Sequence, residues 1–401
     1  MNPAVLGCVG TAKNTGKTTA LTAILGEARR HGYRPALTSI GYDGEELDNL
    51  TGLPKPRVDV EPGDLVASAL PCLERAPAGW DMVADCGVAT ALGPLVLARV
   101  TSPGRVILAG PAHRRGLATL CRLLAARREA DLVLVDGAFG RLSPLARAHG
   151  MVLSTGAARS RDLNALGREA RAIAGLLSLP RERLRGLPGR RPRLLRPLGA
   201  DEAEEAARLL ATGRDVLVAG MVTLAGLAQV AHALRPPPGA PETRTPGGVA
   251  GGPGAPEAQG WGRLVFTDPV QLLLAGEPEQ VSNVVCRIIS RGVRLAVGSG
   301  PAILAVTANP CYPVPLGGGR FRAGAVDAGA LRTSLEEHLG AGVPVVDVLR
   351  DGPDRLWRVV EERLLARGPR ARGAAEPLPG TVRAGFPAQM RGTDPGGPCT
   401  G

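Results

Sequence analysis

Residues 4–30, AVLGCVGTAKNTGKTTALTAILGEARR, contain three signals that together decide the expected fold. Residues 4–9 form a short apolar run of the kind found in buried parallel strands. A glycine-bearing loop follows, and residues 17–30 place Leu21, Ile24 and Leu25 at helical spacing. A strand, a loop and a helix in this order predict an α/β protein with a doubly wound, mainly parallel sheet.

Residues 10–19, GTAKNTGKTT, have the composition of a loop that binds a phosphate chain. Such binding requires converging backbone N–H groups, a helix N-terminus, a cation and a hydroxyl that ligates Mg²⁺. Gly16 lets the backbone close around the phosphate, Lys17 supplies the charge, and Thr18 stands at the helix start as a metal ligand. The expected nucleotide-binding residues are Gly10, Thr11, Lys13, Asn14, Thr15, Gly16, Lys17, Thr18 and Thr19.

The loop departs in one respect from the usual G-x4-GK[ST] spacing, because Thr11 occupies the position of the first glycine and Gly10 lies one residue earlier. Its lysines nevertheless favour a chemical role. The chain has three lysines and 45 arginines, and two of those lysines, Lys13 and Lys17, lie in this loop. A glycine-rich turn with solvated lysines is the alternative interpretation.

Residues 132–138, LVLVDGA, form the second element of the expected site. An apolar strand that delivers a carboxylate at its carboxyl end is what a Mg²⁺-nucleotide site requires beside the phosphate loop. Asp136 is therefore expected to support the metal through water. Asp85, in residues 82–87 (MVADCG), is a rival for this role on a weaker strand, and its alternative interpretation is a turn residue.

Residues 40–46, IGYDGEE, follow the second expected strand, residues 35–40. An acidic loop at this place can order the attacking water and sense the γ-phosphate. Asp43 is the candidate, although a solvated acid in an ordinary turn is the competing interpretation. The expected catalytic residues are thus Lys17, Asp43 and Asp136, and the expected metal-supporting residues are Thr18 and Asp136.

These motifs bear a family resemblance. The G-T-x4-G-K-T form of residues 10–18 resembles the dethiobiotin synthetase group, and residues 13–19, KNTGKTT, resemble the loop of the molybdopterin-guanine dinucleotide accessory proteins. Both belong to the SIMIBI-type P-loop proteins, which include the MinD-like ATPases. The signature Lys of the MinD-like proteins would fall at Ala12, one residue before Lys13. The resemblance implies a P-loop nucleoside triphosphatase that uses ATP and Mg²⁺.

A longer resemblance extends over about residues 4–350. The order of KNTGKTT, LTSIGYDGEELDNLTGLPKP, VILAGPA, VDGAFGR and AVTANP is similar to the P-loop subunit of lysine 5,6-aminomutase reactivase. That family is an ATP-dependent partner of a MutS-like protein, and the two restore a cobalamin-dependent aminomutase whose cofactor is damaged. The resemblance implies such protein partners for this chain.

Three classes of function remain open on the sequence alone. The first expectation is a Mg²⁺-dependent ATPase that acts as a switch or chaperone. An ATP-dependent, carboxylate-activating synthetase of the dethiobiotin synthetase type is the second, and a GTP-binding cofactor-assembly accessory protein is the third. No NKxD-type guanine motif occurs, so ATP and GTP both remain open, as does the oligomeric state.

The net charge of +11 does not indicate a nucleic-acid-binding protein. Residues 181–196 hold seven Arg and one Glu, and residues 367–401 hold five Arg and two acidic residues, so nine of the eleven charges lie in two Pro- or Gly-rich segments. Aromatic residues make up only 2% of the chain, which leaves few platforms for stacking bases. We therefore expect no nucleic-acid partner.

Composition also divides the chain. Residues 1–179 are expected to form the P-loop domain, with a hairpin or an edge addition to the sheet around the turn at residues 101–104. Residues 180–197 are an expected Arg/Pro-rich linker, and residues 198–366 an expected second α/β domain with strands at 215–219, 264–267, 303–307 and 343–348. Residues 235–260 are an expected disordered insertion, and residues 367–401 an expected disordered tail.

The location of the protein is expected to be cytoplasmic, without membrane association. No stretch approaches 18 consecutive apolar residues, and the start of the chain lacks the basic and apolar regions of a secretory signal. The cysteines form no CxxC pair and the histidines no HxxxH pair, so no zinc or iron site built by the protein alone is expected.

Overall fold

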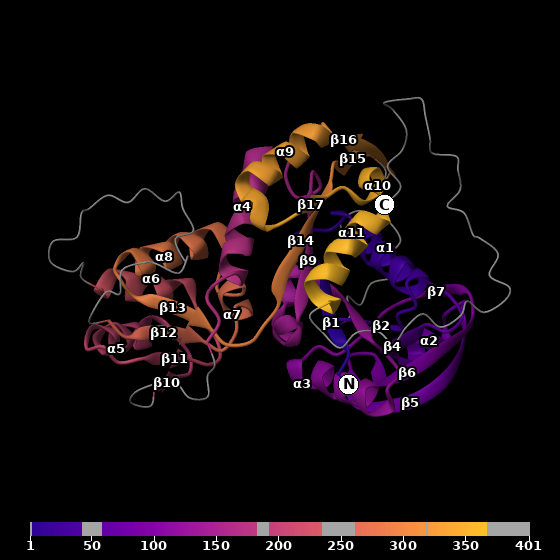
Figure 1. The fold of residues 1–401 in the computed structure, drawn as a ribbon, viewed down its shortest axis with the longest axis horizontal. Coiled ribbons are helices and arrows are strands. Elements are labelled where there is room, and N and C mark those ends of the chain that lie inside the picture. The colour runs from indigo at the N-terminus through magenta and orange to yellow at the C-terminus, as the bar shows by residue number, and fades with distance from the viewer. Residues whose placement is uncertain (1, 42–57, 183–191, 235–260, 318–319, 367–401) are drawn as a thin grey trace.

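The computed structural model describes residues 2–41, 58–182, 192–234, 261–317 and 320–366. Its main feature is a nine-stranded, mainly parallel sheet flanked by helices, with the strand order β17-β14-β9-β1-β8-β2-β4-β6-β5 (Figure 1). The predicted α/β class with a mainly parallel sheet is confirmed.

The seven strands from β17 to β4 in this order run parallel. Strand β6 runs antiparallel to β4, and the edge strand β5 runs antiparallel to β6. The strands are β1 (Ala4–Gly10), β2 (Pro35–Ser39), β4 (Leu65–Ala69), β5 (Gly79–Thr90), β6 (Gly93–Ser102), β8 (Leu132–Ala138), β9 (Gly150–Gly156), β14 (Ala302–Asn309) and β17 (Val345–Val346). Residues 101–104 do not form the predicted hairpin, because β7 (Gly104–Val106) pairs with β3 (Val58–Val60) and not with β6. The alternative, an addition at the edge of the sheet, agrees with the antiparallel pairing of β6 with β4 and β5.

Helices pack against both faces of the large sheet. Successive side chains of a strand point to opposite faces, so neighbouring residues belong to different cores. In β1, Val5 belongs to the apolar core that includes residues of α3 and α4, whereas Leu6 belongs to the core that includes residues of α1 and α11. The helices on the face of Leu6 are α1 (Lys17–Arg30), α10 (Val348–Asp351) and α11 (Pro353–Val360). Those on the face of Val5 are α3 (Arg114–Arg127), α4 (Leu163–Leu177) and α9 (Ala328–Leu339).

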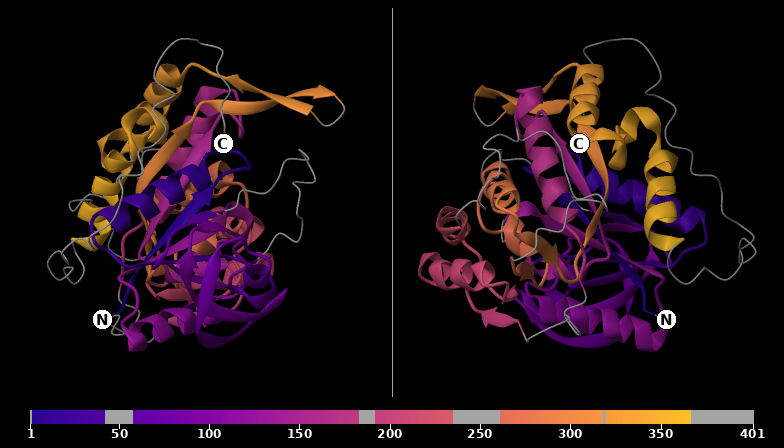
Figure 2. Two further views of the ribbon diagram at one scale, coloured as in Figure 1. Left: turned by 90° about the vertical axis from the view of Figure 1, so that its right-hand side faces the viewer. Right: turned by 60° about the vertical axis from the view of Figure 1, so that its left-hand side comes forward.

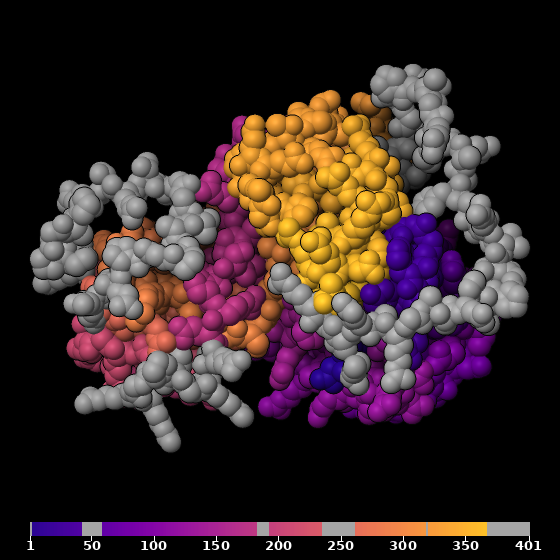
Figure 3. Space-filling model, in the orientation of Figure 1, coloured from indigo at the N-terminus to yellow at the C-terminus, as the bar shows by residue number. Residues whose placement is uncertain are grey.

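A second, smaller parallel sheet forms a lobe beside the large one (Figures 1 and 3). Its strands, in the order of the sheet, are β10 (Arg193–Leu195), β11 (Val216–Val218), β12 (Arg263–Phe266) and β13 (Arg294–Val297). Its helices are α5 (Ala200–Ala211), α6 (Leu224–Ala233), α7 (Val270–Leu273) and α8 (Pro278–Ser290). Because α4 contacts both α7 and α8, the core of this small-sheet lobe is continuous with that of the large sheet.

The two sheets divide the chain differently from the predicted domains 1–179 and 198–366. Strand β10 lies inside the predicted linker, 180–197, and β14 and β17 return to the large sheet although they lie in the predicted second domain. The small-sheet lobe is thus an insertion between β9 and β14. Alternation of strands and helices cannot show which sheet a strand joins, because the pairing of β14 with β9 is a long-range contact. The segments 235–260 and 367–401 lie outside the described residues.

The remaining elements are short. A hairpin of β15 (Cys311–Gly317) and β16 (Arg320–Ala325) extends away from the large sheet (Figure 2). The others are α2 (Leu70–Glu74), the 3-10 helices η1 (Phe139–Arg141), η2 (Ser143–Arg147) and η3 (Gly340–Gly342), and the π-helix η4 (Glu361–Leu365). Within the described ranges, no helix is long and apolar enough to cross a membrane.

Candidate functional site

The loop that joins β1 to α1 makes a tight turn at the carboxyl edge of the large sheet. Gly16, the residue that precedes α1, has a φ of 84°, and Asn14 has a φ of 61°. Glycine adopts this left-handed conformation without strain, and Asn tolerates it better than most residues. A Cβ atom on Gly10 would lie 2.8 Å from Thr15 Oγ1, so the turn also needs a glycine where the strand ends. The sequence of the loop therefore accounts for its shape.

The N-terminus of α1 presents backbone N–H groups. The first intrahelical hydrogen bond is donated by the Ala20 N–H to the Gly16 carbonyl at 3.0 Å. The N–H groups of the residues before Ala20 have no acceptor within the helix, and Gly16 has no side chain that could cap them. Together with the helix dipole, these groups form an environment suited to an anion.

A lysine and a carboxylate meet beside this helix terminus. Strand β8 pairs directly with β1, so that Asp136 lies opposite Cys8, and Lys17 Nζ is 2.8 Å from Asp136 Oδ1. Each of the two side chains is 25% exposed. The Lys17 ammonium group is therefore the charged partner of the buried Oδ1 atom, and no other donor in the described part of the chain is bonded to that atom. That oxygen can still accept a hydrogen bond from water, including water bound to a metal.

Cys8 takes no part in the chemistry of this site. Burial, and to a lesser extent the neighbouring Asp136 carboxylate, raise the pKa of the Cys8 thiol to about 12. Since the thiolate is the reactive form of cysteine, this thiol is inert near neutral pH. Cys8 therefore acts as an apolar residue in the core between the large sheet and α1.

Two of the predicted binding residues use their side chains to hold the loop in place. The Thr11 N–H donates to the Ser154 carbonyl at 3.0 Å, and the Thr11 hydroxyl donates to Thr155 Oγ1 at 3.0 Å. The Thr15 hydroxyl donates to the Ala12 carbonyl at 2.9 Å. These bonds fix the loop to the end of β9 and close it on itself, so the Thr11 N–H and both hydroxyls are already used before any ligand binds.

Asn309 also supports the loop, although its sequence context did not predict this role. It ends β14, and its side-chain Nδ2 donates to the Asn14 carbonyl at 2.8 Å, which supports the loop from a position 295 residues away in sequence. The Asn309 carbonyl accepts from the Ala157 N–H at 2.9 Å, so the ends of β14 and β9 are also joined. A polar residue after an apolar strand was the available signal, but its proximity to the loop depends on strand pairing.

The other predicted residues fall into three groups. Lys13 is exposed on the loop, and Thr18 and Thr19 are half-buried in the first turn of α1. Asp43 lies outside the described residues, although Ile40, just before that segment, donates its N–H to the Asp136 carbonyl at 2.9 Å. The described part of the chain thus reaches β8 three residues before Asp43.

The rival carboxylate, Asp85, is far from the loop. It lies on β5, the edge strand that β8, β2, β4 and β6 separate from β1. Its Oδ1 atom accepts a hydrogen bond from the Gly87 N–H at 2.8 Å, the geometry of a local turn. Of the two candidates, only Asp136 is next to Lys17.

The donors at this site fit a magnesium ion that arrives with a nucleotide. In the described ranges, no group of three or more His, Cys, Asp or Glu side chains could hold a metal ion. Magnesium bound with a nucleotide needs no such cluster, because phosphate oxygens and water supply most of its ligands. The Oδ1 atom of Asp136 and the Thr18 hydroxyl are the groups of this chain that would complete its coordination.

A cleft opens beside the loop, between the large sheet and the small-sheet lobe. Thr11, Phe139 and Arg159 line it on the side of the large sheet. On the side of the lobe it is lined by Leu273, Leu274, Gly276, Glu277 and Pro278. This part of the cleft has a volume of about 330 Å³. The carboxyl edge of a parallel sheet and the junction of two lobes are both common places for ligands.

No protein-family model matches the chain, and no curated protein or solved structure matches it. The assignment of a function therefore rests on the loop at residues 10–19, on Asp136 and on their geometry.

Proposed function

We propose that this protein is a Mg²⁺-dependent P-loop ATPase that acts as a switch or chaperone toward a protein partner. The observation that carries the proposal is the contact of 2.8 Å between Lys17 Nζ and Asp136 Oδ1, beside a helix terminus that follows a left-handed glycine. The Lys17 ammonium group, the Asp136 carboxylate and the N–H groups that have no acceptor within α1 are the parts that a triphosphate and its metal require.

Each residue has a defined task in this proposal. The N–H groups at the start of α1 bind the β- and γ-phosphates, and Lys17 exchanges Asp136 for phosphate oxygens. Thr18 would hold the magnesium ion, with Asp136 supporting it through water. When bound, the ion neutralises charge on the phosphate oxygens. Asp43 orders the attacking water, and release of phosphate frees its loop, which passes the signal to the partner.

The proposed partners follow from the longer resemblance. The motifs shared in order with the P-loop subunit of lysine 5,6-aminomutase reactivase include residues 13–19, 135–141 and 305–310. The first of these motifs contains Lys17 and the second contains Asp136. The third contains Asn309, which contacts the loop. We therefore propose a MutS-like protein and a cobalamin-dependent aminomutase as the partners, and the cytoplasm as the location.

A second candidate function is an ATP-dependent synthetase that activates a carboxylate. The loop favours it, because the G-T-x4-G-K-T form of residues 10–18 resembles that of the dethiobiotin synthetase group. The two functions differ in what stimulates turnover. A synthetase responds to a small carboxylic acid, whereas a chaperone ATPase responds to its protein partner.

The test is nucleotide binding and hydrolysis with and without Mg²⁺, for the wild type, Lys17→Ala and Thr18→Ala. We expect Lys17→Ala to lower kcat/KM by about 100-fold or more and Thr18→Ala to weaken the dependence on Mg²⁺. Thr212→Ala, at an exposed position after α5, is the matched control and should behave like the wild type. Normal binding and hydrolysis by Lys17→Ala would show that the site is assigned incorrectly.

A further inference from the structure

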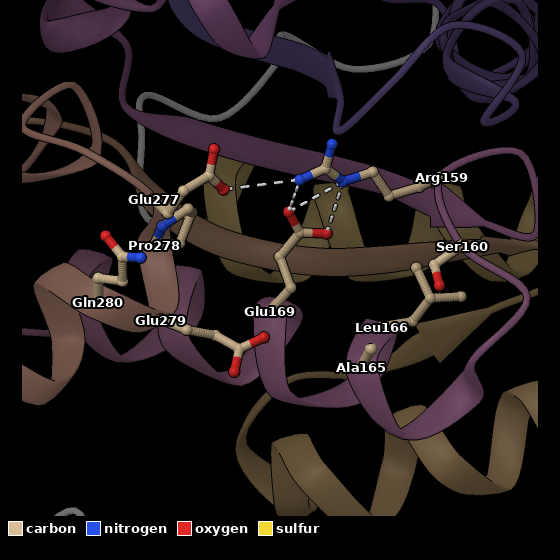
Figure 4. Close-up of a pocket in the computed structure, with 9 residues that line it drawn as sticks. All are labelled: Arg159, Ser160, Ala165, Leu166, Glu169, Glu277, Pro278, Glu279 and Gln280. Atoms are coloured by element: carbon tan, nitrogen blue, oxygen red, sulfur yellow. Dashed lines mark hydrogen bonds and ion pairs between the residues drawn. The ribbon is translucent and has the colours of Figure 1, made fainter.

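The cleft between the two lobes continues beyond the part that touches the loop. A second cavity of about 400 Å³ adjoins the first and shares four lining residues with it: Arg159, Glu169, Glu277 and Pro278. Figure 4 shows Arg159 between the carboxylates of Glu169 and Glu277, with Glu279 and Gln280 on the neighbouring turn. We call this combined space the interlobe cleft.

The backbone on both sides of the interlobe cleft is well anchored. Arg159 belongs to the turn that follows β9, and its N–H donates to the Gly156 carbonyl at 2.8 Å. Glu277 is the residue that precedes α8, and Pro278 occupies the first helical position, where its fixed φ suits a helix start. The side chains therefore project into the cleft from two fixed points.

The charged groups of the interlobe cleft are not balanced. Buried Glu169 satisfies Arg159, since Arg159 Nη2 and Nε donate to Glu169 Oε1 at 2.8 and 3.1 Å. Glu277 is 3.7 Å from Arg159, beyond hydrogen-bond distance, and its side chain is 69% exposed.

Glu279 and Arg168 complete the group of charges, with Arg168 Nε 3.3 Å from Glu279 Oε2. Arg159 and three glutamates line the cleft, and Arg168, which lines neither cavity, pairs with Glu279, so these five side chains together have a net charge of −1. A cleft with an excess of carboxylate attracts a cation. Glu277, the least engaged of the three glutamates, is the group with most capacity to bind it.

Part of the cleft wall near Glu277 is apolar. Phe139, Leu273 and Leu274 line the cavity that also contains Glu277, and Leu274 is 45% exposed, which is high for a leucine. The described residues contain no cluster of ligands suited to a metal ion. A cation with an apolar portion fits this surface better than an inorganic ion, and the cavity volumes are those of small-molecule sites.

We propose that the interlobe cleft binds a small organic ammonium compound, with its ammonium group at Glu277 and its alkyl chain against Leu273 and Leu274. The site is separate from the proposed phosphate site and does not depend on it. Because Thr11 lines the same cavity, the bound ammonium compound lies next to the nucleotide loop.

The experiment titrates the full chain with n-butylammonium and, separately, with n-butyrate at constant ionic strength, and follows binding by calorimetry. We expect saturable binding of n-butylammonium, weakened about fivefold to tenfold by Glu277→Gln, and no binding of n-butyrate. Glu204→Gln is the matched control, because Glu204 is exposed on α5 of the same lobe and does not line the cleft. It should bind n-butylammonium like the wild type.

Three results would overturn the proposal. They are binding of n-butyrate in place of n-butylammonium, equal affinity of Glu277→Gln and the wild type, and no saturable binding of either compound. Since Glu277 is exposed, its variant should fold normally, which a thermal melt verifies.

Lys17→Ala separates this proposal from the nucleotide proposal. It should lose ATP binding and keep n-butylammonium binding. If the wild type binds n-butylammonium but no ATP, only the proposed nucleotide function fails. If it binds ATP but no n-butylammonium, only the proposal for the interlobe cleft fails.

Discussion

Two carboxylates at the carboxyl ends of parallel strands have opposite surroundings in this molecule. Asp136 ends an apolar strand of the large sheet, and Asp268 follows the apolar strand β12 of the small-sheet lobe. Asp268 is buried; it accepts hydrogen bonds from the Gln271 N–H at 3.3 Å and the Thr267 hydroxyl at 3.2 Å, and it pairs with Arg114. Asp136 is 25% exposed, and among the described residues its Oδ1 atom has only Lys17 as a partner.

The difference shows how a structural acid can be told from a functional one. A buried carboxylate with all its oxygens bonded stabilises the fold, and here the Asp268–Arg114 pair also joins the small-sheet lobe to the start of α3. A partly exposed carboxylate whose partner is a lysine at a helix N-terminus is available to a ligand that takes the place of that lysine. The short sequences LVLVDG and LVFTDP do not reveal this difference, because it depends on partners distant in sequence.

Asn substitution at the two carboxylates gives the largest expected contrast. Asp136→Asn should lower ATP hydrolysis by about 100-fold and leave the free energy of unfolding nearly unchanged. Asp268→Asn should lower the free energy of unfolding by about 2 kcal/mol, because it removes the charge that Arg114 faces, and should change hydrolysis by less than about threefold. Urea denaturation and steady-state kinetics on both variants measure the two effects. If Asp136→Asn and Asp268→Asn both lowered hydrolysis, or both lowered the free energy of unfolding, the distinction between the two carboxylates would be wrong.

Asn309→Ala tests whether the hydrogen bond from β14 to the loop increases the affinity for ATP. Loss of the hydrogen bond to the Asn14 carbonyl should weaken ATP binding by about threefold to tenfold and change the free energy of unfolding by about 1 kcal/mol or less. Calorimetric titration with a non-hydrolysable ATP analogue gives the affinity. Asn164→Ala, at an exposed position on α4, is the control. Unchanged affinity in Asn309→Ala would mean that the loop keeps its shape without Asn309.

The smallest expected effect lies at the other edge of the large sheet. Arg34 and Asp131 precede β2 and β8, and Arg34 Nη2 is 2.8 Å from Asp131 Oδ1. Hydrogen bonding from Arg34 holds the pKa of Asp131 below its usual value of 3.8. A depressed carboxyl pKa stabilises the fold above the unfolded-state pKa, and this contribution is lost as the pH falls through the folded-state pKa.

Asp131→Asn should therefore lower the free energy of unfolding by about 1 kcal/mol or less at pH 7, since both partners are substantially exposed. The difference from the wild type should shrink as the pH falls below about 4. Denaturant titrations across this pH range measure it. ATP hydrolysis should not change, because this edge of the sheet is opposite the loop. A difference that stays constant down to the lowest pH at which the protein folds would contradict the role of the carboxylate charge.

Local sequence predicted the strand, loop and helix of residues 4–30 and the strand that delivers Asp136, because hydrophobic periodicity and glycine conformation are local properties. The choice of Asp136 over Asp85 needed the strand order. Asn309, the interlobe cleft and the true extent of the small-sheet lobe were not predictable, since each depends on which distant strands pair. The contact of Asn309 with Asn14 spans 295 residues, and no periodic pattern encodes it.

The most direct test of the central claim is a crystal structure with Mg²⁺ and a non-hydrolysable ATP analogue. We predict that the N–H groups of residues 16–18 donate to phosphate oxygens, that Lys17 Nζ leaves Asp136 for the phosphates, and that Thr18 Oγ1 binds the metal. A nucleotide bound elsewhere, or a Lys17 that still contacts Asp136 beside an empty loop, would contradict the claim.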